Sequence, residues 1–218
     1  MTTRIWITRT EPAAARSARA WADTGFDPVV APLLQVVPVT GHAAVPDDAE
    51  LVFTSSHAVR HCGIEGDGRR VYAVGEATAK AARSRGFVNV VSGEGDWKVL
   101  SKRIENTSKP VLHISGSVVR GTLVETLLER GLKAERRIVY RSKPVADWPL
   151  DTRELDAVAL YSPLASETLM ALPERDLSGL TAYCLSANIA APLHGIGVRI
   201  AEKPTEAALL ACSRLLPD

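Results

Sequence analysis

The sequence lacks the motifs that mark the common nucleotide-binding enzymes. No glycine-rich dinucleotide fingerprint follows the first expected strand, and no phosphate-binding loop ends in Lys-Ser or Lys-Thr. Cysteine is also scarce. Cys62, Cys184 and Cys212 are odd in number, far apart and without metal-ligand spacing, which favours free thiols in a reducing compartment. The absence of both glycine-rich motifs leaves nucleotide binding without support from the sequence.

Histidine is too sparse to build a metal site. His57 and His61 are four residues apart and would share a helix face, but no third ligand is in view. No serine-centred nucleophile elbow and no histidine–carboxylate constellation is visible. We therefore expect no metal and no cofactor, and hydrolytic or redox chemistry has little support.

An excess of charge of one sign is missing as well. Lys and Arg number 26 against 25 acidic residues, so net charge gives no argument for nucleic acid. No apolar run approaches the ~20 residues that a membrane span needs. With 46% hydrophobic and 23% charged residues, the composition is that of a globular protein. We expect a cytoplasmic protein that binds a small-molecule substrate, with no nucleic-acid or membrane partner.

What the chain does contain is an internal repeat. Three pairs of segments recur in the same order, and each reads as an apolar strand followed by a helix. The pairs are residues 4–9 with 111–115, 49–56 with 156–163, and 71–79 with 182–190. Continuous apolar strands that alternate with helices predict an α/β fold whose parallel sheets are covered on both faces.

Two long extended runs interrupt this alternation. Residues 29–39 and 137–145 each follow an expected helix and carry β-branched residues, with a proline near the end. We interpret them as connectors between two domains, which would form a cleft between two lobes. The expected domains are residues 1–37 with 142–218, which form a discontinuous domain, and residues 38–141, which form a continuous one.

Small polar residues follow the expected strands of both halves. Ligands of open parallel sheets bind beyond the carboxyl ends of the strands, where helix N-termini favour anions. Helix capping is the more frequent explanation of any single turn, and only the repetition in both lobes favours binding. The turns are Thr54-Ser55-Ser56, Gly75 with Thr78, and Ser115-Gly116-Ser117 in one lobe, and Thr8-Arg9-Thr10, Ser162 and Ser186 to Asn188 in the other.

Four short motifs, taken in order, resemble those of the uroporphyrinogen-III synthase family over essentially the whole chain. Residues 53–59 are similar to the family's Phe-Thr-Ser-x-x-Ala-Val element, and residues 74–79 to its Val-Gly-x-x-Thr-Ala helix start. Residues 139–141 are similar to its Val-Tyr-x-Thr connector, and residues 201–205 to its Ala-Glu-x-Pro-Thr ending. The order and intervals make the resemblance fairly specific.

The resemblance implies two flavodoxin-like lobes joined by a two-stranded linker, with the substrate hydroxymethylbilane between them. It implies a cyclising hydro-lyase that forms uroporphyrinogen III with loss of water and inversion of the last ring, in the synthesis of heme, siroheme or cobalamin. Because spontaneous closure gives the unrotated isomer, the enzyme's work would be to hold a flexible chain in one reactive conformation. We expect a monomer.

The resemblance also suggests roles for individual residues. Tyr140 matches the connector tyrosine and is expected to act on the leaving hydroxyl as a general acid, although a partly buried structural tyrosine is an equal alternative. Because the substrate bears eight carboxylates, cations should line the site, with Arg9, Lys80, Arg120 and Arg141 as candidates. The predicted substrate contacts are Thr8, Arg9, Thr54, Ser55, Ser56, Gly75, Thr78, Ser115, Gly116, Arg120, Ser162, Ser186 and Asn188.

The second half departs from the family pattern. Ser186 stands where glycine is expected, and Ile189 stands where threonine is expected. A side chain at Ser186 would crowd a backbone that approaches the ligand, and Ile189 removes a hydroxyl. Two other interpretations therefore stay open, a two-lobed cytoplasmic small-molecule binding or sensor protein and a catalytically reduced family member.

Overall fold

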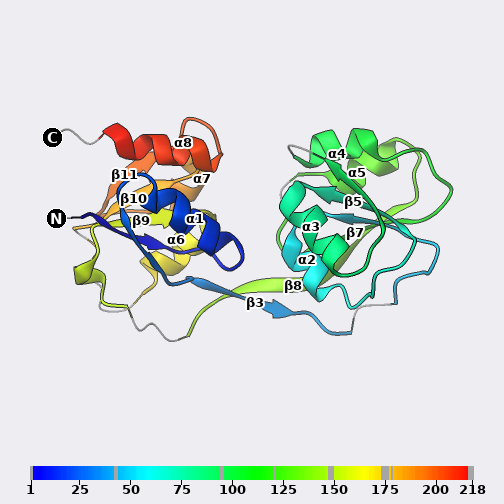
Figure 1. The fold of residues 1–218 in the computed structure, drawn as a ribbon, viewed down its shortest axis with the longest axis horizontal. Coiled ribbons are helices and arrows are strands. Elements are labelled where there is room, and N and C mark those ends of the chain that lie inside the picture. The colour runs from blue at the N-terminus through cyan, green and yellow to red at the C-terminus, as the bar shows by residue number, and fades with distance from the viewer. Residues whose placement is uncertain are drawn as a thin grey trace. The chain divides into compact units, whose positions relative to one another are not determined.

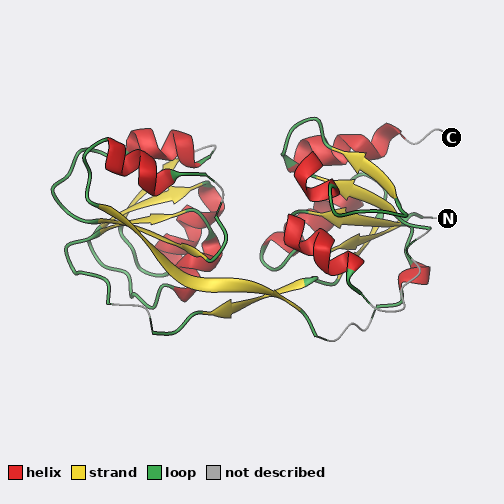
Figure 2. Ribbon diagram, turned by 180° about the vertical axis from the view of Figure 1, so that it is seen from behind, coloured by secondary structure: helices red, strands yellow, loops and turns green. Residues whose placement is uncertain are grey.

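The chain folds into two compact α/β units. The computed structural model describes residues 2–41, 44–93, 96–119, 121–146, 150–172, 177 and 179–215. Unit 1 comprises Met1–Gln35 and Lys143–Asp218, and unit 2 comprises Val36–Ser142 (Figure 1). Both units are layered, with helices packed on the two faces of a sheet (Figure 2). The α/β prediction is confirmed.

Unit 1 is built on a five-stranded sheet in the order β11-β10-β9-β1-β2, in which every recorded pairing is parallel. Within this unit the order is that of a flavodoxin-like sheet, 2-1-3-4-5. Its strands are β1 (Arg4–Ile7), β2 (Asp27–Val30), β9 (Ala157–Leu160), β10 (Thr181–Cys184) and β11 (Gly197–Ile200). Its helices are α1 (Ala13–Ala22), α6 (Pro163–Met170), α7 (Ala187–Ala190) and α8 (Glu206–Ala211), with 3-10 turns at Thr152–Glu154 and Cys212–Leu215.

Alternation along the unit 1 strands supplies both of its cores. Ile5 and Ile7 of β1 pack with Trp21 of α1 and Leu209 of α8 on one face of the sheet. Trp6, between them in sequence, points to the opposite face. There it packs among residues of β9, β10, α6 and α7. The sheet is therefore buried on both sides, as its continuous apolar strands predict.

Unit 2 is built on a six-stranded sheet in the order β3-β8-β7-β4-β5-β6. The pairings from β8 to β6 are parallel. Its strands are β3 (Leu34–Pro38), β4 (Glu50–Phe53), β5 (Arg70–Val74), β6 (Asn89–Gly93), β7 (Val111–Gly116) and β8 (Ala134–Pro144). Its helices are α2 (Ser56–His61), α3 (Glu76–Ser84), α4 (Trp97–Arg103) and α5 (Leu123–Glu129). Helices α2 and α3 cover the face with Leu51 and Phe53, and α4 and α5 cover the face with Val52.

The internal repeat predicted from the sequence is confirmed by the topology. In both units the strands of each sequence pair hold the same position in the sheet, β1 with β7, β9 with β4, and β10 with β5. The two sheets therefore have one spatial order but different chain orders. Apart from β3, which has no counterpart in unit 1, unit 2 starts at the strand that is third in unit 1, so the other strands of the two units are circular permutations of one another.

Strands β3 and β8 carry the chain across the boundary between the units. The Val39 N–H donates to the Val139 carbonyl at 2.9 Å, and the Val145 N–H donates to the Leu33 carbonyl at 3.1 Å. The residue numbers of the partners decrease along β8 as those along β3 increase, so the two strands run antiparallel.

The extended run expected at residues 29–39 is two strands rather than one. Strand β2 ends at Val30 and β3 begins at Leu34. Pro32 lies between them and has no N–H to donate to a sheet ladder. Leu33 is fully buried, and its N–H donates to the Thr8 carbonyl at 2.9 Å. The break lets Leu33 enter the core of unit 1 before the chain leaves that unit.

Candidate functional site

In unit 2 the predicted polar turns meet at one edge of the sheet. Strands β7, β4 and β5 are parallel neighbours, and Phe53 near the end of β4 stands opposite Ile114 and Ala73. Their carboxyl ends therefore lie side by side. The chain order of the strands reverses between β4 and β7, which is the position where open α/β sheets bind ligands.

Thr54, directly after β4, is held by a buried histidine of β7. Its Oγ1 lies 2.9 Å from Nε2 of His113. His113 is 4% exposed. Burial, with a further contribution from the Arg136 guanidinium, lowers the pKa of His113 to about 4. The imidazole is neutral at pH 7 and fixes the Thr54 hydroxyl by a neutral hydrogen bond.

Arg136 of β8 organises the turn that follows β7. Its Nε donates to the Ser115 hydroxyl at 2.8 Å, and its Nη2 donates to the carbonyls of Gly116 at 2.5 Å and Ser117 at 2.7 Å. Ser115 is 1% exposed. Its hydroxyl is thus engaged inside the unit, and its predicted substrate contact remains a prediction that this geometry does not favour.

A β-bulge sets the direction of Tyr140. Partners on β7 and β8 advance one for one as far as Ser115 and Ile138, and then Gly116 stands opposite Tyr140. Val139 has no opposite residue, so two residues of β8 face one residue of β7. The extra residue reverses the alternation of the strand. Tyr140 consequently packs on the same core as Val139, beneath α2.

The Tyr140 ring lies between a glycine and two histidines. A Cβ at Gly116 would come within 2.6 Å of the ring's Cζ, so only glycine fits beneath it. The rings of His57 and His61, on successive turns of α2, have centroids 5.8 Å and 6.1 Å from that of Tyr140. Burial lowers the pKa of His57, and the nearby charges of Arg60 and His61 lower it further. Tyr140 itself is half-buried.

The remaining polar residues of this edge begin helices. The Ser55 hydroxyl caps α2 by accepting from the His57 N–H at 3.1 Å, and Ser56 is the first residue of that helix. Gly75 precedes α3 with a φ of +73°, a backbone region that favours glycine. Its N–H donates to the Gly93 carbonyl at 2.8 Å. Thr78, in the first turn of α3, is 5% exposed.

In unit 1 the corresponding turns follow β1 and β9, at the point where that sheet's chain order reverses. The Thr8 hydroxyl is buried and donates to the Ala159 carbonyl at 2.6 Å. The guanidinium of Arg9 lies over the Tyr161 ring, 4.3 Å from its centroid. The structure therefore brings Thr8 and Arg9 to the switch point, with Thr8 turned inward and Arg9 partly exposed.

The last group of predicted contacts lies at the N-termini of α6 and α7. The Ser162 hydroxyl caps α6 by accepting from the Ala165 N–H at 3.2 Å. Ser186 precedes α7 but forms no side-chain cap, and Asn188 is exposed. Ile189 is fully buried, so an apolar residue suits that position. Arg120 lies outside the described residues.

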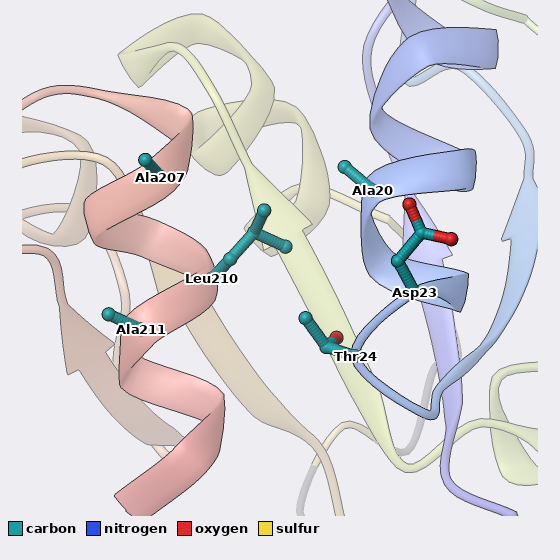
Figure 3. A pocket seen from close by; sticks show the side chains of 6 residues that line it. All are labelled: Ala20, Asp23, Thr24, Ala207, Leu210 and Ala211. Carbon is teal, nitrogen blue, oxygen red and sulfur yellow. The ribbon is translucent and has the colours of Figure 1, made fainter.

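One surface pocket of unit 1 lies apart from all these turns. It opens between the end of α1 and α8, as Figure 3 shows, and none of the predicted contacts lines it. Its lining residues are Ala20, Asp23, Thr24, Ala207, Leu210 and Ala211. Within the described residues no group of three or more His, Cys, Asp or Glu side chains could hold a metal ion. No described helix has the length and apolarity of a membrane span.

Comparison with known proteins identifies the family. The sequence model described as "Uroporphyrinogen-III synthase HemD" matches residues 15–211 of the chain. The chain belongs to the uroporphyrinogen-III synthase family. No match is found among curated proteins.

Solved structures of uroporphyrinogen-III synthases share the fold. The enzyme from Helicobacter pylori is 21% identical with a TM-score of 0.66, and the match covers 100% of both chains. A mutant of the enzyme from Thermus thermophilus is 19% identical with a TM-score of 0.52, and the match covers 98% of both chains. Identities this low show the fold alone. With the two α/β units, they confirm the predicted fold class.

Sequence reasoning missed three residues that shape this uroporphyrinogen-III synthase fold at its switch points. His113 lies inside an expected strand and Arg136 lies one residue before the extended run expected at 137–145, and the two become neighbours only through the β7–β8 register. Tyr161 follows an expected strand, but nothing in the sequence showed that Arg9 would stack on it. The available signal was polarity, because a histidine within an otherwise apolar strand needs a partner when buried.

Proposed function

We propose that this chain catalyses the cyclisation of hydroxymethylbilane to uroporphyrinogen III, with loss of water and inversion of the last ring. The observation that carries the proposal is the match of the uroporphyrinogen-III synthase family over residues 15–211. In chemical class the enzyme would be a cyclising hydro-lyase. We further propose that it acts in the cytoplasm as a monomer and supplies the synthesis of heme, siroheme or cobalamin.

Tyr140 is the proposed proton donor. The bulge and Gly116 fix its ring at the carboxyl end of the sheet, and its side chain stays half-buried rather than enclosed. A phenol there can donate a hydrogen bond to the terminal hydroxyl of hydroxymethylbilane and protonate it as the C–O bond breaks. Water then leaves, and an azafulvenium cation remains on the substrate.

The rest of the proposed mechanism is positioning. The last ring must attack through its substituted carbon, although attack through the unsubstituted carbon gives isomer I without an enzyme. Thr54, Ser56 and the turn at Gly75 present hydroxyl and backbone groups at the edge of the unit 2 sheet. We propose that they hold carboxylates of the substrate, because helix N-termini favour anions.

Unit 1 is also proposed to carry substrate-binding residues. Its candidates are Arg9, whose guanidinium is partly exposed, Ser186, whose side chain forms no helix cap, and Asn188, which is exposed. Thr8, Ser115 and Ser162 have hydroxyls engaged within the protein, so we assign them to shaping the turns. Such a mechanism requires a proton donor and a template, and no cofactor.

The test supplies freshly generated hydroxymethylbilane to the full chain and separates the uroporphyrin isomers after oxidation. Formation of isomer III above the background of spontaneously formed isomer I supports the proposal. Binding of the tetrapyrrole without isomer III contradicts it. The variant Tyr140→Phe tests the assigned acid, because it removes the phenolic proton and keeps the ring that packs on Gly116.

A further inference from the structure

At the switch point of unit 1, Arg9 already has a carboxylate neighbour within the protein, that of Glu206. The Ser17 hydroxyl donates a hydrogen bond to the Glu206 carboxylate. Arg9 Nη1 donates to the same Ser17 oxygen at 3.0 Å and lies 3.5 Å from Glu206 Oε1. The three residues come from the turn after β1, from α1 and from the first position of α8.

The Arg9 guanidinium, which is the cation of this cluster, is held in place by an aromatic ring. The Arg9 guanidinium stacks on the Tyr161 ring, an arrangement that fixes its plane and favours its charge. Tyr161 is 9% exposed, and its hydroxyl accepts a hydrogen bond from Trp21 Nε1 at 3.1 Å. Ser17 is fully buried. A guanidinium fixed in this way loses little further entropy when it binds a second carboxylate.

Arg9 has donors to spare. The Arg9–Glu206 distance of 3.5 Å is long for an ion pair, and no described residue accepts a hydrogen bond from Arg9 Nε or Nη2. The Arg9 side chain is 28% exposed and that of Glu206 is 32% exposed. The planar fork of an arginine binds a carboxylate through two parallel hydrogen bonds, and the unused edge of Arg9 can offer them.

We propose that Arg9 binds one carboxylate of the ligand and that Glu206 sets the affinity by competing for the same cation. Ser17 and Tyr161 act as positioning residues, which orient Arg9 and keep Glu206 within reach. A ligand with a single carboxylate gains little binding free energy at Arg9, because it must compete with the Glu206 carboxylate. A polycarboxylate that is also bound through its other carboxylates can displace Glu206 from Arg9. The identity of the ligand rests on the proposed function, but the competition between Glu206 and a ligand anion does not.

A double-mutant cycle on the full chain tests the proposal, with uroporphyrin III as the octacarboxylate probe and its fluorescence as the readout. Arg9→Gln is expected to raise the Kd about tenfold, in the range of one charge-assisted contact. Glu206→Gln is expected to lower the Kd about threefold to tenfold. In the Arg9→Gln background, Glu206→Gln should change log Kd by less than half as much as it does in the wild-type protein, because the partner of Glu206 is gone.

Matched variants separate the contact from charge and folding effects. Glu167→Gln removes the same charge from an exposed residue of α6, on the other face of the unit 1 sheet, and should leave the Kd within twofold. Arg9→Lys keeps the charge but loses the planar fork, so its Kd should lie between wild type and Arg9→Gln. If Arg9→Gln does not fold, Arg9→Lys carries the cycle instead.

Two results would overturn the inference. One is an unchanged Kd in a folded Arg9 variant. The other is an equal effect of Glu206→Gln with and without Arg9, which would mean that Glu206 only repels anions through space. Wild-type production of isomer III is measured separately, so the proposed function can stand when this inference fails. If the wild-type protein binds the probe but forms no isomer III from hydroxymethylbilane, the inference stands and the proposed function is wrong.

Discussion

Tyr140 lies directly over the Cα of Gly116, so that a methyl group there would sit 2.6 Å from the ring's Cζ and 2.9 Å from its hydroxyl oxygen. The contact exists because the bulge at Val139 turns Tyr140 onto the α2 face of the sheet. The bulge therefore places this connector tyrosine at the switch point, over the last residue of β7. The assignment of Tyr140 as the acid depends on this placement.

Tyr140→Phe should lower the rate of isomer III formation by about 100-fold, the lower end of what a general acid contributes. The melting temperature should change little, because the ring that packs on Gly116 is kept. Tyr72→Phe is the matched control. Tyr72 lies on β5 of the same unit, and its buried hydroxyl has no hydrogen-bond partner within the described part of the chain. Equal turnover in wild type and Tyr140→Phe would remove the proposed role.

Gly116→Ala should destabilise the protein by about 1–3 kcal/mol, because the added methyl group overpacks against Tyr140. Turnover should fall as well, since the ring must move away. Urea unfolding and the isomer assay measure the two effects. Gly68→Ala is the control, as nothing lies within 4 Å of a Cβ at that exposed position. A Gly116→Ala protein with wild-type stability would show that Tyr140 does not lie over this residue.

His113 should make stability depend on pH. Its pKa of about 4 in the folded protein lies below the ordinary value of 6.5, so the unfolded chain binds the proton more readily. Protonation therefore favours unfolding. This contribution is fully present above pH 6.5 and is lost as the pH falls towards 4, by about 3 kcal/mol in total.

The variant His113→Asn should consequently lose less stability than wild type between pH 6.5 and 4, whatever its stability at pH 7. Unfolding free energies measured across that range give the comparison. His194→Asn, a change at an exposed histidine, should follow the wild-type curve. Parallel curves for wild type and His113→Asn would contradict the burial of a neutral imidazole beside Thr54.

The serines before α6 and α7 should respond differently to alanine. Ser162→Ala removes a cap and should cost about 1 kcal/mol of stability. Ser186 forms no cap, so Ser186→Ala should cost less than about 0.5 kcal/mol and instead raise KM, if its hydroxyl meets the substrate. Thermal unfolding and steady-state kinetics on both variants separate capping from binding. The reverse pattern would exchange the roles assigned to the two serines.

The fold could be predicted from the sequence because its signal is repeated. Each apolar strand leads into a helix, and the three matched pairs place equivalent strands at equivalent positions in both sheets. The position of the break at Pro32 was not predicted. A run of β-branched residues looks continuous, and the burial of Leu33 that divides it depends on the finished core.

The details of the candidate site depend on tertiary pairing, which no local pattern encodes. Thr54 meets His113 across 59 positions, and Arg9 meets Glu206 across 197. The register shift at Val139 leaves no mark in the sequence, yet it decides which face Tyr140 takes. Several predicted contacts, Thr8 and Ser115 among them, have hydroxyls that satisfy buried backbone or side-chain groups instead. Hydroxyls at strand ends serve both purposes, and only the folded structure distinguishes them.

The most direct test of this account is the initial rate of isomer III formation from fresh hydroxymethylbilane at a series of concentrations of the full chain. We predict a rate proportional to protein concentration, with isomer III replacing isomer I as the main product. In Tyr140→Phe the slope of that line should fall by about 100-fold. Isomer I as the main product at every concentration, with no rise in isomer III, would contradict the account.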